Sequence, residues 1–205
     1  MNEIVLSAPT RFPKILLFLF HGYGKSKENF ASVAKEILKA RPDMEIHIPD
    51  GVEECTEDNG REWFEFNGEN VSVWEKDFLK KSPQVIEYID KILEEKKLKY
   101  SNVVLAGFSQ GAMVSLGIGL KLGVGGVISF SGLMLDPKSC VGKINTKVLL
   151  LHGGADDVIP IEAMKLTERV LSNAGVPVKS EIKTTLKHEI DREQIAKAMD
   201  FLKTL

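Results

Sequence analysis

The chain of 205 residues is 43% hydrophobic and 27% charged, with a formal net charge of −2. This length and composition fit one globular domain with a substantial core. No block of lysine and arginine stands out, so the charge pattern indicates no nucleic-acid partner. The most apolar run, residues 15–20, is too short to cross a membrane as a helix, and we expect no stable membrane insertion.

The cysteines and the first residues indicate a cellular compartment. Cys55 and Cys140, the two cysteines, are too few for a disulfide framework, and free thiols are typical of a reducing environment. Residues 1–12 include the acidic Glu3 and lack a basic stretch followed by a long apolar core, so we expect no signal peptide. The sequence therefore predicts a cytoplasmic protein.

Short, nearly continuous apolar runs recur along the chain. Such runs are typical of strands that are buried on both faces of a parallel sheet. They span residues 14–20, 44–48, 102–106, 126–130 and 147–151. Residues 178–184 alternate between apolar and polar instead, which predicts a strand nearer an edge of the sheet.

Stretches with helical periodicity lie between these strands. Apolar residues recur at helical spacing within residues 30–38, 85–93 and 195–202, and a further helical pattern covers residues 112–120. Alternation of strands and helices predicts an α/β fold, with a mostly parallel central sheet and helices on both faces. We expect a single domain over residues 1–205.

Residues 51–79 interrupt the alternation of strands and helices. This stretch is polar and resembles a loop, yet it carries aromatic residues at Trp63, Phe64, Phe66, Trp74 and Phe78. Long loops without regular structure are uncommon in compact domains unless they are functional or disordered, and the aromatic residues argue against disorder. We expect a loop insertion near the active site, which either packs on the sheet edge or lines the substrate site.

A serine lies between two glycines where a strand meets a helix, in Gly107-Phe108-Ser109-Gln110-Gly111. Glycines let the backbone pass close to itself in a tight turn. A turn of this kind, the nucleophile elbow, exposes the serine hydroxyl at the start of the following helix. A small-residue turn without chemistry is the alternative, but the flanking strand and helix favour a nucleophile.

A nucleophilic serine needs a base and a third group that orients the base. After such an elbow the acid and then the histidine follow along the chain. Of the four histidines, His152 and His188 come after Ser109. His152 ends a buried strand and is expected to have a core or loop-bracing role, whereas His188 precedes the final helix and is expected to be the base.

The acid is expected on the loop between these two histidines. Asp156 and Asp157 directly follow a strand end, where catalytic groups collect in parallel α/β sheets. Adjacent carboxylates cannot both point at one imidazole, and the residues by themselves leave the choice open. The other aspartate is expected to cap a helix or face water.

An oxyanion hole needs two N–H donors aimed at one point. The main-chain N–H of Gln110, directly after the nucleophile, is expected to supply one. The loop after an early strand, His21-Gly22-Tyr23-Gly24, is expected to supply the other through Tyr23. His21 precedes the serine and is expected to hold that loop by hydrogen bonds.

Several motifs occur in one order along the chain: LFHGYG at residues 19–24, REWFEF at 61–66, GFSQGA at 107–112, SFSGLM at 129–134, LLHGGADDVIP at 150–160 and KHEI at 187–190. Together they resemble the phospholipase/carboxylesterase family of small serine hydrolases, which includes the acyl-protein thioesterases and has the α/β-hydrolase fold. The resemblance implies hydrolysis of carboxylic esters or thioesters without a metal or cofactor. Several members pair, so it also implies a homodimer as one assembly.

Carried over by position, the resemblance implies that Ser109 is the nucleophile and His188 the base. Its pattern H-G-x-x-D-x-x-[VI]-P implies that the acid is Asp156. Tyr23 and Gln110 fall on the oxyanion positions. Our candidates for the wall that holds the acyl group of the substrate are Trp63, Phe64, Leu133 and Met134.

Two features depart from the family pattern. Thr185-Leu186-Lys187 precedes His188 where the family usually has a pair of glycines, which leaves the geometry of this loop open. Lys25 stands where an acidic residue is common, which changes the charge at the mouth of the site.

Other functions use the same residues. A lysophospholipase or an acyltransferase would keep the triad, whereas a noncatalytic scaffold that binds a ligand would not need it, so the complete triad counts against the scaffold. The sequence His188-Glu189-Ile190-Asp191 lacks the second histidine of the metal-binding pattern H-E-x-x-H, so we expect no metal.

Overall fold

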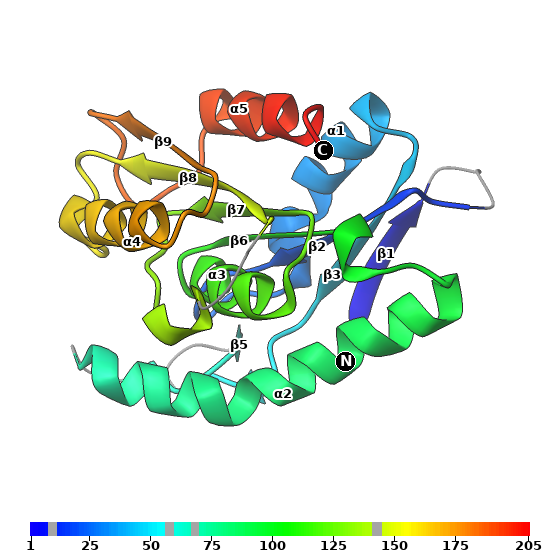
Figure 1. The fold of residues 1–205 in the computed structure, drawn as a ribbon, viewed down its shortest axis with the longest axis horizontal. Helices are drawn as coiled ribbons and strands as arrows, with labels where there is room; N and C mark the ends of the chain where they lie inside the picture. Colours follow the sequence, from blue (N-terminus) through cyan, green and yellow to red (C-terminus); the bar gives the residue numbers. More distant parts are fainter. Residues whose placement is uncertain (8–11, 56–59, 67–69, 141–144) are drawn as a thin grey trace.

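A central sheet of seven strands carries helices on both faces in the computed structural model, which describes residues 1–7, 12–55, 60–66, 70–140 and 145–205 (Figure 1). The strand order is β1-β3-β2-β6-β7-β8-β9. The strands are β1 (Glu3–Ser7), β2 (Ile15–Phe20), β3 (Met44–Pro49), β6 (Val103–Phe108), β7 (Gly126–Phe130), β8 (Lys147–Gly153) and β9 (Val178–Lys183). Strand β1 pairs with β3 in the antiparallel direction, and the remaining neighbours are parallel.

The helices follow the strands in the expected alternation. They are α1 (Ala31–Ala40), α2 (Val71–Lys96), α3 (Gln110–Leu122), α4 (Ile161–Asn173) and α5 (Arg192–Leu202), with short 3-10 turns at η1 (Lys27–Phe30), η2 (Tyr100–Asn102) and η3 (Pro137–Cys140). A two-stranded hairpin, β4 (Glu53–Glu54) and β5 (Arg61–Glu62), lies outside the sheet. The predicted α/β class is therefore confirmed, whereas β1 and the hairpin were not predicted.

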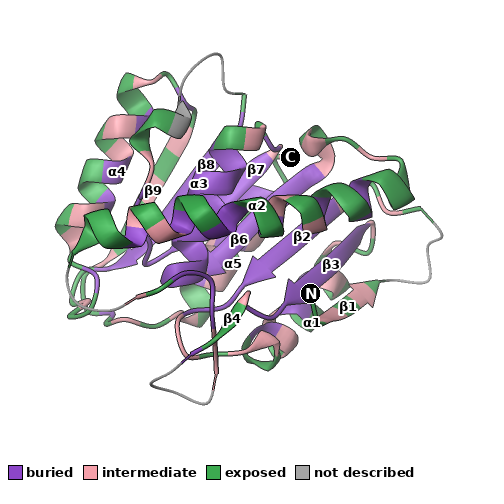
Figure 2. Ribbon diagram, turned by 90° about the horizontal axis from the view of Figure 1, so that it is seen from below, coloured by how far each residue is buried: buried purple, intermediate pink, exposed green. Residues whose placement is uncertain are grey.

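Alternate residues of the central strands face opposite layers. Leu16, Phe18 and Phe20 of β2 belong to one apolar cluster with residues of α2, α3 and α4. Leu17 and Leu19 belong to a second cluster with residues of α1 and α5. Figure 2 shows the central strands buried and the outer faces of the helices exposed. This two-sided burial explains why the strands are almost continuously apolar in sequence.

The structure corrects the extent of the loop expected over residues 51–79. Helix α2 begins at Val71, and the side chain of Asn70 caps it by accepting the N–H of Ser72. Trp74 and Phe78, four residues apart, lie on one face of this helix and are buried. Residues 71–79 are thus helical rather than loop, while residues 56–59 and 67–69 lie outside the described part of the chain.

The parallel strands end at one edge of the sheet. The segments that follow β2, β6, β8 and β9 therefore meet there, although they are far apart in sequence. Ligands and catalytic groups collect at this edge in α/β proteins. The candidate triad and the expected oxyanion donors lie on these segments, whereas Leu133 and Met134 follow β7 and Trp63 and Phe64 follow β5.

Candidate active site

Ser109 occupies a strained turn between β6 and α3. Its φ of 53° and ψ of −117° place a residue with a side chain in the region that favours glycine. A Cβ on Gly107 would lie 2.3 Å from the main-chain carbon of Gly111, and a Cβ on Gly111 would lie 2.1 Å from the carbonyl oxygen of Phe20. The Ser109 N–H donates to the carbonyl of Phe130 at 2.9 Å, which holds the turn. The tight turn expected around this serine is present.

A chain of hydrogen bonds joins Ser109, His188 and Asp156. The Oγ of Ser109 lies 3.0 Å from Nε2 of His188, and Nδ1 of His188 lies 2.8 Å from Oδ2 of Asp156. With Nδ1–H donating to the carboxylate, Nε2 is free to accept the serine proton. Of the two adjacent aspartates, Asp156 faces the imidazole and Asp157 is exposed to water.

The Asp156 carboxylate is held as an anion. Burial raises its pKa, but hydrogen bonds from His188 and from the N–H groups of Ile159 and Val158 lower it more, so the pKa lies below its ordinary value. The two N–H groups donate to Oδ1 at 2.9 and 3.0 Å, while Oδ2 accepts from His188. Asp156 is therefore ionised at neutral pH and fixed in orientation.

His152 braces the loop that carries Asp156. It is fully buried, and its Nε2–H donates to the carbonyl of Ile159 at 2.8 Å. The same nitrogen lies 3.4 Å from Oδ2 of Asp156. The loop-bracing role predicted for this histidine is confirmed.

The loop before His188 packs on the loop before Asp156. The N–H of Ala155 donates to the carbonyl of Leu186 at 3.0 Å. A Cβ on Gly153 would lie 2.3 Å from that carbonyl oxygen, and a Cβ on Gly154 would lie 2.7 Å from Cα of Thr184. Glycines on the aspartate loop therefore allow the close approach of the histidine loop.

The expected oxyanion donors lie on two segments next to the nucleophile. Gln110 is the first residue of α3, where a helix leaves its N–H groups without an acceptor inside the helix. Tyr23 follows Gly22, whose Cβ position would be 3.5 Å from Cβ of Ser109. The loop with Tyr23 therefore passes directly beside the serine.

His21 holds the loop that carries Tyr23 by hydrogen bonds. It is fully buried, its Nε2 accepts the N–H of Gly51 at 2.9 Å, and its Nδ1–H donates to the carbonyl of Gly22 at 2.8 Å. Burial lowers the pKa of His21, which keeps the imidazole neutral and able to accept from Gly51. The anchoring role predicted for His21 is confirmed.

The structure corrects the role expected for Trp63 and Phe64. Both are buried in the core, so neither forms a wall open to substrate. The indole N–H of Trp63 donates to the carbonyl of His21 at 2.9 Å. The side chain of Gln110 binds the backbone of the same segment: Oε1 accepts the N–H of Trp63 at 2.9 Å, and Nε2 donates to the carbonyl of Phe64 at 2.7 Å.

The other two wall candidates keep a small exposed area. Leu133 and Met134 are 9% and 8% exposed, and the N–H of Met134 donates to Oγ1 of Thr167. They follow β7, whose last residue, Phe130, accepts the N–H of Ser109. Their contact with the acyl group stays a prediction.

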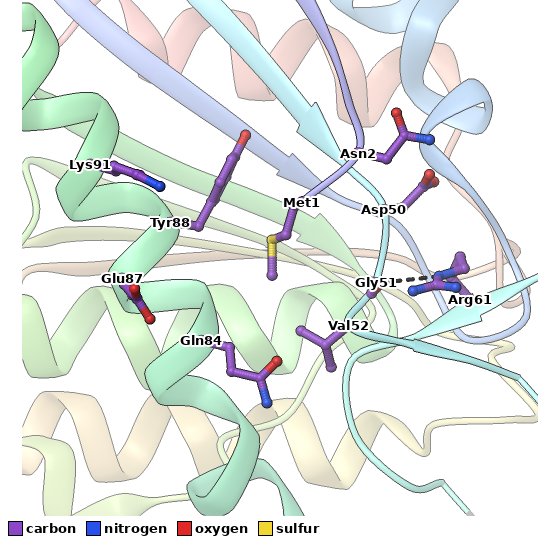
Figure 3. A pocket seen from close by; sticks show the side chains of 10 residues that line it. All are labelled: Met1, Asn2, Asp50, Gly51, Val52, Arg61, Gln84, Glu87, Tyr88 and Lys91. Atoms are coloured by element: carbon purple, nitrogen blue, oxygen red, sulfur yellow. Dashed lines mark hydrogen bonds between the residues drawn. The ribbon is translucent and has the colours of Figure 1, made fainter.

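Two cavities differ in their relation to the triad. A crevice of about 310 Å³ lies beside His188, with Gly22, Lys25 and Phe108 among its lining residues. A second pocket, of about 470 Å³, lies between the loop at Gly51 and α2, and none of the triad lines it (Figure 3). The pocket with the larger volume is therefore not the candidate site. Lys25 lies at the mouth of the crevice beside His188, as expected.

Comparisons with known proteins identify a family whose model matches the whole chain. A family model described as Phospholipase/Carboxylesterase matches residues 1–205. Esterase YpfH of Escherichia coli (strain K12) is 27% identical over 204 residues, which cover 98% of this chain and 88% of that protein. Acyl-protein thioesterase 1 of Debaryomyces hansenii is 26% identical over 96% of this chain and 94% of its own length.

Solved structures show the same architecture. The crystal structure of esterase PE8 has a TM-score of 0.93 at 26% identity and covers 99% of this chain and 98% of its own. The Bacillus cereus carboxylesterase has a TM-score of 0.82 at 18% identity, covering 100% of this chain and 94% of its own. The chain therefore has the α/β-hydrolase fold. Within the part of the chain that the structure describes, no helix is long and apolar enough to span a membrane.

Proposed function

The chain belongs to the phospholipase/carboxylesterase family and is a carboxylic ester hydrolase, and we propose that it cleaves esters or thioesters through an acyl-enzyme on Ser109. The observation that carries this assignment is the hydrogen-bonded series Ser109–His188–Asp156. A serine hydroxyl becomes nucleophilic when a positioned base removes its proton.

In the acylation step, each residue of the triad has one role. The Oγ of Ser109 attacks the acyl carbon as its proton passes to Nε2 of His188, and Asp156 stabilises the resulting imidazolium. The N–H groups of Tyr23 and Gln110 stabilise the negative oxygen of the tetrahedral intermediate. The bond from carbon to the leaving oxygen or sulfur then breaks, and His188 returns the proton to the leaving alcohol or thiol.

Deacylation repeats the sequence with water. His188 takes a proton from water as the water oxygen attacks the acyl carbon, and it returns that proton to Oγ when the acid leaves. An acyl-binding role for Leu133 and Met134 is supported by their small exposed area and by their place shortly after Phe130, whose carbonyl accepts the N–H of Ser109. No step requires a redox change or an added cofactor.

The test is hydrolysis of matched esters and thioesters, from acetyl to palmitoyl, by the wild type and by Ser109→Ala. We expect turnover by the wild type, loss of turnover in the variant, and an acyl adduct on Ser109 by mass spectrometry. Turnover that persists in Ser109→Ala, or a wild type inactive on the whole series, would refute the proposal. Added alcohols and lysophospholipids in the same assay separate an acyltransferase or lysophospholipase from a simple esterase.

Three further predictions concern the whole protein. We propose that residues 1–205 fold as one domain, which limited proteolysis tests. A cytoplasmic location is supported by the free, buried thiol of Cys55, and the side chain of Cys140 lies outside the described residues. A homodimer is supported by the exposed apolar residues Val71, Val73 and Leu79 on α2, and light scattering on the purified protein tests it.

A further inference from the structure

The crevice beside His188 lies close to the nucleophile. Gly22 and His188 both line it, and both lie next to Ser109: the Cβ position of Gly22 is 3.5 Å from Cβ of Ser109, and Nε2 of His188 is 3.0 Å from its Oγ. The ring of Phe108 packs against the His188 imidazole, with their centroids 4.7 Å apart, and forms part of the same wall. A group bonded to the reacting carbon can therefore reach this space directly.

Apolar side chains form the interior of the crevice. Phe30 of η1, Val33 of α1 and Ile195 of α5 line it, on the face of the sheet that α1 and α5 cover. A smaller cavity of about 10 Å³ is lined by the same three residues. Phe30, Val33 and Ile195 thus border both spaces and make the lining between α1 and α5 apolar.

Polar side chains surround the mouth of the crevice. Lys25, Asn29 and Glu189 line it and are exposed. An apolar interior with a polar rim is typical of sites that bind the body of a small ligand. The volume of about 310 Å³ lies near the lower end for such sites, which favours a compact group over a long chain.

The direction of proton transfer indicates which part of the substrate the crevice can bind. His188 must donate to the leaving oxygen or sulfur, so that atom lies within hydrogen-bond reach of Nε2 when the bond breaks. The rest of the leaving group then continues past the imidazole and Phe108. Space for it is available in the crevice that these two side chains line.

We propose that the crevice between α1 and α5 binds the alcohol or thiol portion of the substrate and selects compact apolar leaving groups, such as short alkyl, cycloalkyl or phenyl. This inference rests on the proposed acyl-enzyme function. It makes Val33 and Ile195 determinants of leaving-group specificity, separate from the residues that hold the acyl group.

The experiment varies the leaving group at constant acyl group. Acetate esters of methanol, propanol, pentanol and cyclohexanol are assayed with the wild type, Val33→Trp, Val33→Ala and the matched control Val5→Trp, which changes an exposed residue of β1. For the wild type we expect kcat/KM to rise about fourfold for each methylene that enters the crevice. Val33→Trp should reduce this rise to below about twofold, Val33→Ala should shift the best substrate to a larger alcohol, and Val5→Trp should keep the wild-type profile.

A second series varies the acyl chain of methyl esters. We expect Val33→Trp to have the same relative preference among acyl chains as the wild type, which also reports that the variant is folded. If Val33→Trp instead changes the acyl profile, the crevice holds the acyl group and the inference is wrong. The inference is also wrong if the wild type is active through Ser109 but hydrolyses all the acetate esters with the same kcat/KM. A wild type without any Ser109-dependent turnover overturns the proposed function itself.

Discussion

Gln110 accepts the main-chain N–H of Trp63 through Oε1 at 2.9 Å, across 47 residues of sequence. Its Nε2 donates to the carbonyl of Phe64, so one side chain satisfies two buried backbone groups of the segment after β5. The main chain of the same residue is our proposed oxyanion donor. Gln110 therefore links the segment with Trp63 and Phe64 to the start of α3.

Replacing Gln110 by alanine should weaken both stability and turnover. The change leaves the N–H of Trp63 and the carbonyl of Phe64 buried without partners, at a cost of about 1–3 kcal/mol each in the free energy of unfolding. Urea denaturation measures this loss, and kcat should fall with it. Gln194→Ala is the matched control, because Gln194 is also buried but its amide atoms have no hydrogen-bond partner among the described residues. Equal losses in the two variants would contradict the role of Gln110.

Asp156→Asn should lower kcat by roughly 10³–10⁴, since an amide in place of the carboxylate neither favours the Nδ1–H tautomer of His188 nor stabilises the imidazolium. The paired variant Asp157→Asn changes an exposed neighbour and should leave kcat within about twofold of the wild type. Steady-state kinetics on a short-chain ester measures both. A large loss in Asp157→Asn, with little in Asp156→Asn, would reverse our assignment of the acid.

Gly111→Ala should destabilise the protein, although alanine favours a helix over glycine by about 1 kcal/mol. The added Cβ would lie 2.1 Å from the carbonyl oxygen of Phe20, a main-chain atom of a central strand that cannot move aside. We expect a loss of about 3 kcal/mol or more in the free energy of unfolding. The comparison is Gly123→Ala, where φ is +66° and no heavy atom lies within 4 Å, so only about 1–2 kcal/mol for the left-handed backbone is expected. Similar losses in the two variants would show that contact with β2 is not the cause.

Stability should fall on acidification through His21. Burial lowers its pKa in the folded protein below the ordinary 6.5, so the unfolded chain binds the proton more tightly. The free energy of unfolding therefore has its full value above about pH 6.5 and decreases as the pH falls from there through the lower, folded pKa. His21→Gln places an acceptor near the position of Nε2 that does not titrate, and it should flatten this part of the profile. Measurement of Tm from pH 7.5 to pH 5 tests this prediction. If Tm of the variant falls with pH as steeply as that of the wild type, His21 is not the cause.

The residues of the candidate triad could be predicted because chemistry leaves few alternatives for the serine and the histidine, whereas the choice of Asp156 over Asp157 rested on the resemblance to the family. A nucleophile between glycines, an acid after a strand and a histidine before the last helix each have few alternatives in this chain, and the structure brings Ser109, Asp156 and His188 within hydrogen-bond distance. The central strands β2, β3, β6, β7 and β8 were also predicted to within a few residues, because burial on both faces makes them continuously apolar.

The segment around Trp63 and Phe64 was harder to interpret. Its polar neighbours resemble a surface loop, and nothing in the local pattern shows that Gln110, 47 residues away, binds its backbone. The start of α2 was missed because its apolar residues Trp74 and Phe78 lie among charged ones. Strand β1 is only five residues long and pairs with β3 alone, which gives a weak pattern in sequence.

Gly153 and Gly154 pack closely against the loop before His188. The two neighbouring segments therefore tolerate substitution to different extents. Side chains are excluded at the two glycines, while Leu186 holds the contact through its carbonyl group. Residues 184, 185 and 187 can therefore diverge in sequence with little effect on the imidazole, provided that the backbone contact remains, whereas Leu186 is buried. Directed evolution of new selectivity can accordingly randomise the exposed positions Thr184, Thr185 and Lys187 beside the base, whereas the two glycines have to be kept.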